Sequence, residues 1–334
     1  MRNGFNALGR TAAVWTVVGA VLTVWAAFSP LWAAGPVFPQ KGKTIQMLVG
    51  YVAGGSTDVG ARILASGMEK ELGIPVIVVN KPGASAQIAL TTLSQSKPDG
   101  YTIGNSNFPS VIVSYLDPSR KASYTRKSFD PLALHVVDPT LFAVKAESPF
   151  KTLKEVVDAA KANPRKIRVC TTGIESDEAF AILQLQKMTG AQFAQVHFAQ
   201  GVASAMTAFL GGKFEIFCGN VGDLLSQFKS GDVRILGITD DEHSPFYPGV
   251  KTFEEQGYKI YNSSSRGFSA PAGTPKEIVD VLSGAMKKAI FSEEHKKRMA
   301  DMALTVKYKD PVEYGKYWEE YETSMKELLP LTKE

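Results

Sequence analysis

Apolar runs and helical periods alternate along most of the chain. A short apolar run at residues 44–49 predicts a strand, and residues 57–72 repeat apolar positions at helical spacing. The order continues with a strand at 76–80, a helix from about Ala86 and a strand at 101–106. Strands that alternate with helices in this way predict a parallel sheet covered by helices.

The alternation restarts after an extended segment at residues 133–144, which predicts a second α/β unit. A chain of 334 residues has room for two lobes of ordinary domain size. The predicted helices of this second unit cover residues 153–162, 178–189, 202–210 and 221–230, and its strands cover residues 167–171, 194–198, 215–218 and 233–237.

Helix starts are marked by Thr-x-x-Glu pairs with capping-box spacing, in which each side chain can bond the backbone N–H of the other residue. From these pairs and the apolar spacing we expect residues 274–329 to be mostly helical, with one apolar face packed against a sheet. The pairs are Thr152 with Glu155, Thr252 with Glu255 and Thr274 with Glu277, Pro275 and Pro311 suit a first helical turn, and the apolar face is Ile278, Val281, Leu282, Ala285 and Ala289.

The N-terminus has the order of a secretory signal. Two arginines precede an apolar stretch at residues 12–28, which is followed by Pro30 and small residues. We expect cleavage after Ala33 or Ala34 and export of the mature protein. An uncleaved anchor is the alternative, and Pro30 weakens it because proline interrupts a spanning helix.

The composition is that of an ordinary globular protein, with 44% hydrophobic and 21% charged residues. Lys and Arg number 37 against 33 Asp and Glu, and without Arg2 and Arg10 of the predicted signal they number 35 against 33, a net charge of +2. A nearly neutral body argues against nucleic acid as the main partner. Cys170 and Cys218 cannot form a disulfide framework, and the sequence leaves open whether they pair.

A glycine-rich loop at residues 50–58 follows the first predicted strand and opens the first predicted helix. Glycines let the backbone approach a ligand, and the free N–H groups of a helix N-terminus favour an anion. Nucleotide motifs fail here, because Ser56 stands where a phosphate loop needs lysine and Val52 where the dinucleotide motif needs its second glycine. Two interpretations stay open: a ligand-binding loop, or a tight turn with Ser56 or Thr57 as the N-cap.

Two further loops, at residues 170–176 and 197–204, also lie between a predicted strand and a predicted helix. Ligands of open α/β sheets bind at the carboxyl ends of the strands, where such loops gather. Polar loops of two lobes that face one cleft would form a site for a small molecule.

Catalytic and metal-binding patterns are weak in this sequence. It contains neither a G-x-S-x-G elbow nor an H-E-x-x-H motif, and its four histidines have no metal-ligand spacing. Cys170 and His197 both fall near predicted strand ends, but nothing in the sequence supplies a third group to orient them for nucleophilic catalysis. We expect the run at residues 295–298 to be a solvated helix face.

A series of short motifs follows in order along nearly the whole mature chain, at residues 50–58, 73–76, 80–84, 97–102, 207–213, 229–234 and 270–275. Together they resemble the TctC or Bug family of periplasmic solute-binding proteins, which serve tripartite tricarboxylate transporters. An ordered series of motifs is far more specific than a single glycine loop.

The resemblance implies an α/β fold of the two-lobed Venus-flytrap kind, type II-like, in which each lobe is a mainly parallel sheet flanked by helices. After a signal peptide at residues 1–34, lobe 1 would cover 35–136 and 266–334, and lobe 2 would cover 137–265. It implies a periplasmic receptor, not an enzyme, that binds a di- or tricarboxylate or an aromatic carboxylate through backbone amides and delivers it to permease subunits of the transporter. We expect a monomer without cofactor, metal or nucleic acid.

Carried over residue by residue, the ligand-binding loops of the family fall on both predicted lobes. Asp58 is expected to complement the helix dipole rather than to contact the ligand. The expected contacts are Tyr51, Val52, Ala53, Gly54, Gly55, Ser56, Thr57, Ala84, Ser85, Ser106, Asn107 and Phe108 in lobe 1, and Thr171, Thr172, Gly173, Ser176, Phe198, Gly201, Val202, Ala203 and Asn220 in lobe 2.

The sequence departs from the family pattern where specificity would be set. Val52 and Ala53 replace a proline pair, Gly219 stands where aspartate is often found, and residues 263–266 replace an aromatic stretch. Three side chains could accommodate an aromatic carboxylate, although we favour packing or surface roles for them: Phe108, Phe198 and Arg266.

The second-lobe loop is acidic, with Glu175, Asp177 and Glu178. Acids that face a bound carboxylate would repel it, so either these side chains face solvent or the ligand also carries a positive group. We favour solvent, because acids in the first turn of a helix are favourable without any ligand.

Two other functions stay open at this point. The same fold could serve signalling, with the closed protein docking on a receptor kinase, and a secreted hydrolase could use Ser56 or Cys170 as its nucleophile. Turnover that is lost in Ser56→Ala or Cys170→Ala would identify the hydrolase.

Overall fold

The structure is a computed structural model that describes residues 38–198 and 201–333. The predicted signal segment and its cleavage site lie outside these residues. Across the described segments, no helix combines the length and apolar character that crossing a bilayer requires.

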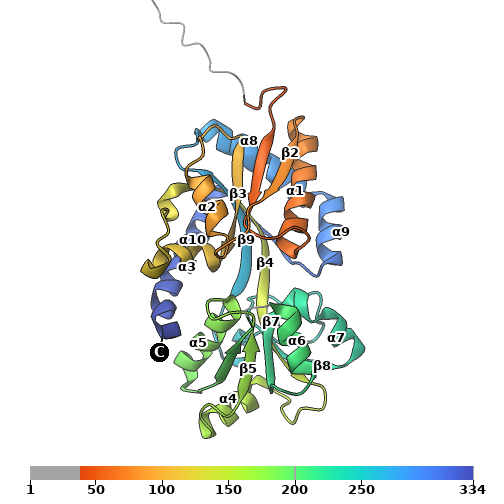
Figure 1. Ribbon diagram of the computed structural model, residues 1–334. Coiled ribbons are helices and arrows are strands. Elements are labelled where there is room, and N and C mark those ends of the chain that lie inside the picture. Colours follow the sequence, from red (N-terminus) through yellow and green to blue (C-terminus); the bar gives the residue numbers. More distant parts are fainter. Residues whose placement is uncertain (1–37, 199–200, 334) are drawn as a thin grey trace, which may run out of the picture. The chain divides into compact units, whose positions relative to one another are not determined.

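Two lobes share the long strand β4 (Phe129–Lys145). The first part of β4 pairs antiparallel with β9 (Ser263–Pro271), and its last residues pair with strands of the other lobe. Figure 1 shows β4 and β9 as the extended strands that run between the lobes. The predicted two-lobed α/β fold is confirmed.

Lobe 1 has a sheet whose first strands are parallel. β1 pairs in parallel with β2 and β3, and β3 pairs antiparallel with β9. Four of the five residues of β1 are buried and apolar, which is typical of a strand covered on both faces. The bounds are β1 (Ile45–Val49), β2 (Val76–Asn80), β3 (Thr102–Phe108) and β10 (Val306–Lys309), which pairs with β4.

Lobe 2 is built around β5, which pairs in parallel with β6 and β7. β4 is the antiparallel partner of both β7 and β8. The bounds are β5 (Arg168–Thr171), β6 (Ala194–His197), β7 (Ile216–Asn220) and β8 (Val233–Ile238).

Helices flank both sheets, and capping chemistry marks two of their starts as predicted. Thr152 and Glu155 form a capping box at α4, and Pro311 is the first residue of α10. The helices are α1 (Ser56–Leu72), α2 (Gln87–Ser94), α3 (Ser110–Leu116), α8 (Lys276–Phe291), α9 (Glu293–Asp301) and α10 (Pro311–Leu328) in lobe 1, and α4 (Leu153–Ala162), α5 (Asp177–Thr189), α6 (Val202–Leu210) and α7 (Leu225–Ser230) in lobe 2.

The predicted capping box of Thr274 with Glu277 was wrong. The backbone N–H of Thr274 donates to Asp130 Oδ2 at 3.0 Å, and its hydroxyl donates to Pro271 O at 2.7 Å. Thr274 therefore joins the end of β9 to the start of β4, and α8 begins two residues later.

Two predicted helical segments are interrupted. Residues 221–230 contain a short 3-10 turn, Val221–Asp223, before α7 begins. The segment at 274–329 contains β10 between α9 and α10, because the chain there adds a strand beside β4. Val281 is 37% exposed, so it does not share the packed face of α8.

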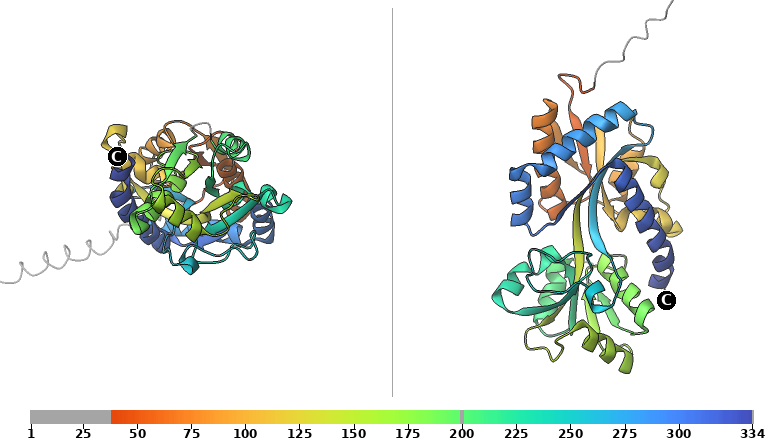
Figure 2. Two further views of the ribbon diagram at one scale, coloured as in Figure 1. Left: turned by 90° about the horizontal axis from the view of Figure 1, so that it is seen from below. Right: turned by 180° about the vertical axis from the view of Figure 1, so that it is seen from behind.

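A cluster of aromatic side chains packs α10 against lobe 1. Trp318 is fully buried, and its ring centroid lies 5.0 Å from that of Phe108 and 6.0 Å from that of Phe129. At its other end α10 reaches lobe 2, where Lys187 pairs with Glu327 at 2.9 Å. Figure 2 shows α10 running from lobe 1 toward α5.

The two cysteines are buried and free. Cys170 lies opposite Phe217 in the register of β5 and β7, so the next residue, Cys218, points to the other face of the sheet. The two thiols belong to different apolar clusters for this reason. The sheet itself keeps them from pairing.

Two buried histidines join α9 to β4. His135 Nε2 and His295 Nε2 lie 2.8 Å apart, so one ring donates and the other accepts. His295 is 2% exposed, which corrects the expectation of a solvated face for this residue, whereas residues 296–298 are exposed as expected. Burial lowers the pKa of His135 well below its usual value and lowers the pKa of His295 to about 4.

We expect the free energy of unfolding to fall as the pH drops from about 6.5 toward 4. In this range the unfolded chain binds protons on both histidines and the folded chain does not, so acid favours unfolding. His295→Gln should flatten this dependence by up to about 1.4 kcal/mol per pH unit. Urea unfolding at several pH values measures the slope, with the exposed His243→Gln as the matched control. A slope that His295→Gln leaves unchanged would contradict this assignment.

Candidate functional site

A cavity of about 520 Å³ is lined by both lobes and by the strands that join them. The loop between β1 and α1, the end of β3, and the loops after β5, β6 and β7 all reach it. The lining residues are Tyr51, Ser56, Thr57, Asn107, Phe108, Pro109, Ser110, Asp138, Thr172, Ser176, Asp177, Glu178, Gly201, Val202, Asn220, Gly222, Asp223, Ser264, Arg266, Met302 and Leu304.

Three helices begin at this cavity. α1 begins at Ser56 after Gly55, and α6 begins at Val202 after Gly201, and in the part of the chain that the structure describes neither start has a capping side chain. α5 differs, because Ser176 caps its own helix. The first N–H groups of α1 and α6 have no acceptor within the helix and can donate to an anion.

Asp58 stabilises the first loop. Its Oδ2 accepts from Gly54 N at 2.9 Å, its Oδ1 accepts from Asn80 Nδ2 at 2.8 Å, and Arg62 pairs with it at 3.0 Å. Burial raises the pKa of Asp58, but these donors outweigh burial and hold the pKa below its usual value. These contacts fit the expected role of a charge in the first turn of α1.

Four carboxylates line the cavity, and two of them overturn the expectation for the second-lobe loop. Asp177 and Glu178 are 6% and 1% exposed, so they do not face solvent. Asp138 of β4 and Asp223, after β7, line the same cavity. The first turn of α5 is directed inward, because Thr140 Oγ1 donates to Asp177 Oδ2 at 2.9 Å.

The third acid of that loop, Glu175, forms an ion pair with Arg120 of lobe 1. Both side chains are partly buried, at 17% and 25% exposed. Glu175 therefore connects the two lobes and is compensated by a cation, unlike its neighbours Asp177 and Glu178.

Asn220 holds the carboxylates in place. Its Nδ2 donates to Asp177 Oδ2 at 2.6 Å and to the backbone oxygen of Asp138 at 3.0 Å, and its N–H donates to Asp223 Oδ2 at 2.8 Å. One amide side chain thus ties β7 to β4 and to α5.

Burial raises the pKa of all four carboxyls. The pKa rises to about 6 at Asp223 and to about 7 at Asp138, and the Arg266 charge opposes the rise at both. For Glu178, burial and then the charge of Asp177 raise the pKa well above its usual value. Burial therefore makes a negative charge on these carboxyls unfavourable unless a positive group lies beside them.

Arg266 of β9 supplies a guanidinium to the cavity, which corrects the expectation of a surface or packing role. Its Nη2 donates to Asp138 Oδ2 at 3.3 Å. Its Nε and Nη1, and Asn107 Oδ1, are buried without a hydrogen-bond partner among the described residues. A buried polar group without a partner costs roughly 1–3 kcal/mol, so a ligand or water is expected to bond these atoms.

Part of the predicted set of binding residues lines this cavity. Their contact with a ligand stays a prediction. Those at the cavity are Tyr51, Ser56, Thr57, Asn107, Phe108, Thr172, Ser176, Gly201, Val202 and Asn220; those away from it are Val52, Ala53, Gly54, Gly55, Ala84, Ser85, Ser106, Thr171, Gly173, Phe198 and Ala203.

Local geometry explains several residues that lie away from the cavity. Val52 is 66% exposed at the outer side of its loop. Side chains alternate along β3, so Ser106 points away from the face of Asn107 and bonds Ser269 Oγ at 3.1 Å. Phe198 packs against Phe214 at 5.6 Å between ring centroids, which fits the packing role that we favoured.

Sequence reasoning missed the residues that come from the joining strands and from distant loops. Asp138 and Ser264 are brought together by the register of β4 and β9, which no local pattern encodes. The acids of α5 were visible in the sequence and were placed wrongly. The missed residues are Pro109, Ser110, Asp138, Asp177, Glu178, Gly222, Asp223, Ser264, Arg266, Met302 and Leu304.

The groups needed for covalent catalysis are not assembled here. Cys170 is fully buried, and burial raises the pKa of its thiol to about 12. His197 Nδ1 lies 2.7 Å from Thr171 Oγ1. Among the described residues, no histidine lines the cavity beside Ser56.

Comparison with known proteins identifies the kind of protein. The profile of the family described as the tripartite tricarboxylate transporter family receptor, TctC, matches residues 60–330. The chain belongs to the TctC family. Its members are periplasmic solute-binding receptors rather than enzymes, and the resemblance found in the sequence is confirmed.

Relatives of this TctC-family chain support the assignment along its length. A UPF0065 protein of Cupriavidus necator is 30% identical over 307 residues, which cover 90% of each chain. A TctC solute-binding protein from Polaromonas, solved without ligand, has a TM-score of 0.79 at 28% identity and covers 88% of this chain and 99% of its own. MatC from Rhodopseudomonas palustris, solved with bound malate, has a TM-score of 0.70 at 25% identity, with 86% and 99% covered.

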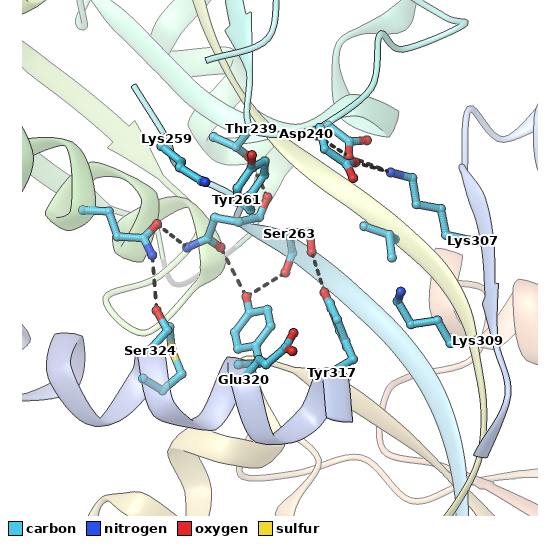
Figure 3. A pocket seen from close by; sticks show the side chains of 16 residues that line it. Thr239, Asp240, Lys259, Tyr261, Ser263, Lys307, Lys309, Tyr317, Glu320 and Ser324 are labelled. Atoms are coloured by element: carbon cyan, nitrogen blue, oxygen red, sulfur yellow. Dashed lines mark hydrogen bonds and ion pairs between the residues drawn. The ribbon is translucent and has the colours of Figure 1, made fainter. Parts of the chain in front are cut away.

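The TctC-family chain also has a second cavity, of about 660 Å³, lined by β9, β10, α10 and the segment after β8 (Figure 3). Its polar groups largely bond one another. Lys307 Nζ reaches Asp240 Oδ1 at 2.7 Å and Asp241 Oδ1 at 2.9 Å, and Tyr321 OH donates to Ser263 O at 2.9 Å. None of the predicted binding residues that the structure describes lines it.

Proposed function

We propose that this TctC-family protein captures a small organic carboxylate in the cavity of about 520 Å³ and delivers it to the permease subunits of a tripartite tricarboxylate transporter. One observation carries the proposal: the N-termini of α1 and α6, one from each lobe, open on the same cavity as the Arg266 guanidinium, and no side chain of the described residues caps either of them. Helix N-termini and arginine both favour carboxylates. The malate bound to MatC supports the same class of ligand.

The size and the donors of the cavity suit such a ligand. Pockets for small molecules usually measure roughly 300–1,000 Å³, and this one falls within that range. The N–H groups of Ser56 and Thr57 would donate from lobe 1, and that of Val202 from lobe 2. Asn107 Nδ2 donates to Thr57 Oγ1 at 3.3 Å and so connects β3 to the start of α1.

A ligand that touches both lobes favours their closed arrangement, because its full set of contacts forms only there. The ion pair between Arg120 and Glu175 would add to the stability of that arrangement, since it also joins the lobes. Release of the ligand to the permease then requires the contacts of the ligand with the two lobes and the ion pair between the lobes to break together.

The remaining expectations belong to the same proposal. The chain would lose a signal peptide at residues 1–34 and act in the periplasm as a monomer. Lobe 1 would cover residues 35–136 and 266–334, and lobe 2 would cover 137–265, so that β4 and β9 carry the hinge.

Ser56→Pro tests the N-terminus of α1. Ser56 is the first residue of α1, and Gly55 before it has φ −72° and ψ 163°, which suits a residue before proline. The helix should therefore tolerate proline while the N–H donor is lost. We expect carboxylates to bind about tenfold or more weakly, because a hydrogen bond to a charged group contributes roughly 1.5–3 kcal/mol.

Thermal unfolding in the presence of aliphatic di- and tricarboxylates and aromatic carboxylates identifies the class of ligand that stabilises the protein. The same assay then ranks the variants by their affinity for that ligand. A ligand at 100 times its dissociation constant adds about 2.7 kcal/mol to stability. Ser56→Ala is the matched control, because it keeps the N–H and removes the hydroxyl. Equal affinities for Ser56→Pro and the unchanged protein would remove this N–H from the site.

A further inference from the structure

The cavity carries more acid than an ordinary di- or tricarboxylate would tolerate. Asp138, Asp177, Glu178 and Asp223 line it, against one guanidinium from Arg266. The described part of its lining contains no lysine and no histidine. Arg266 is already bonded to Asp138. A ligand with carboxylate groups alone would therefore bring no positive group to these carboxyls and would be repelled by each one that is ionised.

Among the described residues, Glu178 is buried without an ion pair to a cation. Two donors hold Asp177, whereas Glu178 has hydroxyl partners only: Thr172 Oγ1 lies 2.9 and 3.0 Å from its two oxygens, and the Ser176 side chain also lowers its pKa. The charged groups that act on Glu178 are further acids, Asp177 and Asp223. A cation beside Glu178 would relieve this repulsion.

Some polar atoms of the cavity lining have no hydrogen-bond partner among the described residues, and they require both an acceptor and a donor on the ligand. Arg266 is 8% exposed, and its Nε and Nη1 have no acceptor in the described chain. Asn107 is 7% exposed, and its Oδ1 has no donor there. A carboxylate would accept from the guanidinium, and an N–H or O–H group would donate to Asn107 Oδ1.

We infer that the ligand is a carboxylate that also carries a cationic nitrogen. Its carboxylate lies between the N-terminus of α1 and the Arg266 guanidinium. Its nitrogen lies against Glu178 and Asp177. The inference rests on the proposed function, because it keeps the carboxylate in the same cavity. It makes Glu178 the residue that separates amino carboxylates from dicarboxylates, by attraction to the first and repulsion of the second.

Three ligands of one chain length test this inference. Glutarate, γ-aminobutyrate and 1,3-diaminopropane differ only in whether each end is a carboxylate or an ammonium. Isothermal titration of ligand-free protein measures their affinities near neutral pH, with matched sets at neighbouring chain lengths. We expect the amino carboxylate to bind about tenfold or more tightly than the dicarboxylate of the same set.

Glu178→Gln keeps the shape of the side chain and removes its charge. It should weaken the amino carboxylate about tenfold and strengthen the dicarboxylate, so that the preference narrows or reverses. Glu175→Gln is the matched control. Glu175 belongs to the same loop but pairs with Arg120. Removal of the Glu175 charge should therefore change the affinities for the amino carboxylate and the dicarboxylate by the same factor.

The outcomes separate this inference from the proposed function. A dicarboxylate that binds as tightly as its amino partner overturns the inference and leaves the proposed function standing. Binding of no ligand at any chain length overturns the inference, and binding of the diamine alone, with no stabilisation by any carboxylate of the full panel, overturns both. The affinities of the unchanged protein decide between these results, so the test does not depend on how Glu178→Gln folds.

Discussion

Trp318→Ala is expected to lower the free energy of unfolding by about 3–5 kcal/mol. Trp318 is fully buried, and it packs on Phe108 and Phe129 with centroid distances of 5.0 and 6.0 Å. Its indole N–H donates to Tyr115 OH at 3.1 Å, so the variant also leaves a hydrogen bond unmade. Urea or thermal unfolding measures the loss.

The same helix offers a matched control. Val312 of α10 is 67% exposed, so Val312→Ala should change stability by about 0.5 kcal/mol or less. Because Phe108 also lines the cavity, Trp318→Ala should weaken ligand binding as well. A loss below about 1 kcal/mol for Trp318→Ala would mean that the aromatic cluster does not anchor α10.

Arg266→Met is the second change with a large expected effect, on stability and on binding together. It leaves the Asp138 carboxyl buried without its cation, which costs about 3–5 kcal/mol. The pKa of Asp138, which burial raises to about 7 against the opposing Arg266 charge, should rise further. The unchanged protein already holds this proton in the folded state up to about pH 7, so the additional loss of stability in the variant grows as the pH rises above about 7.

A double variant separates the two roles of Arg266. Arg266→Met with Asp138→Asn removes both charges, so it should recover much of the stability. It should not recover carboxylate binding, because the guanidinium is still missing. Stability and ligand titrations on the single and double variants measure this split. Full recovery of binding in the double variant would show that Arg266 only neutralises Asp138.

Local sequence chemistry predicted the elements whose signals are local. The helix at Leu153–Ala162 has a capping box at its start and its apolar residues on one face, and its bounds were predicted correctly. The strands that we predicted differ from the structure only at their ends, but β9 was not predicted and β10 lies in a segment that we expected to be helical. Cys170 and Cys218 show the limit of this reasoning, because whether they pair depends on the register of β5 with β7.

The site depends on contacts that a single sequence does not reveal. Acids in the first turn of a helix usually face solvent, and Asp177 instead faces Thr140 of β4 and Asn220 of β7. Arg266 and Asp138 meet because β9 pairs with β4 across more than a hundred residues of chain. The glycine-rich loop was visible from its composition, but which of its residues line the cavity depends on how α1 packs.

We propose that a carboxylate binds at the N-terminus of α1 in the cavity shared by the two lobes. A crystal structure with the carboxylate that gives the largest thermal shift tests it most directly. We expect carboxylate oxygens within hydrogen-bonding distance of the N–H of Ser56 or Thr57 and of the Arg266 nitrogens that have no partner among the described residues. A ligand bound in the second cavity, between β9, β10 and α10, would contradict this binding site.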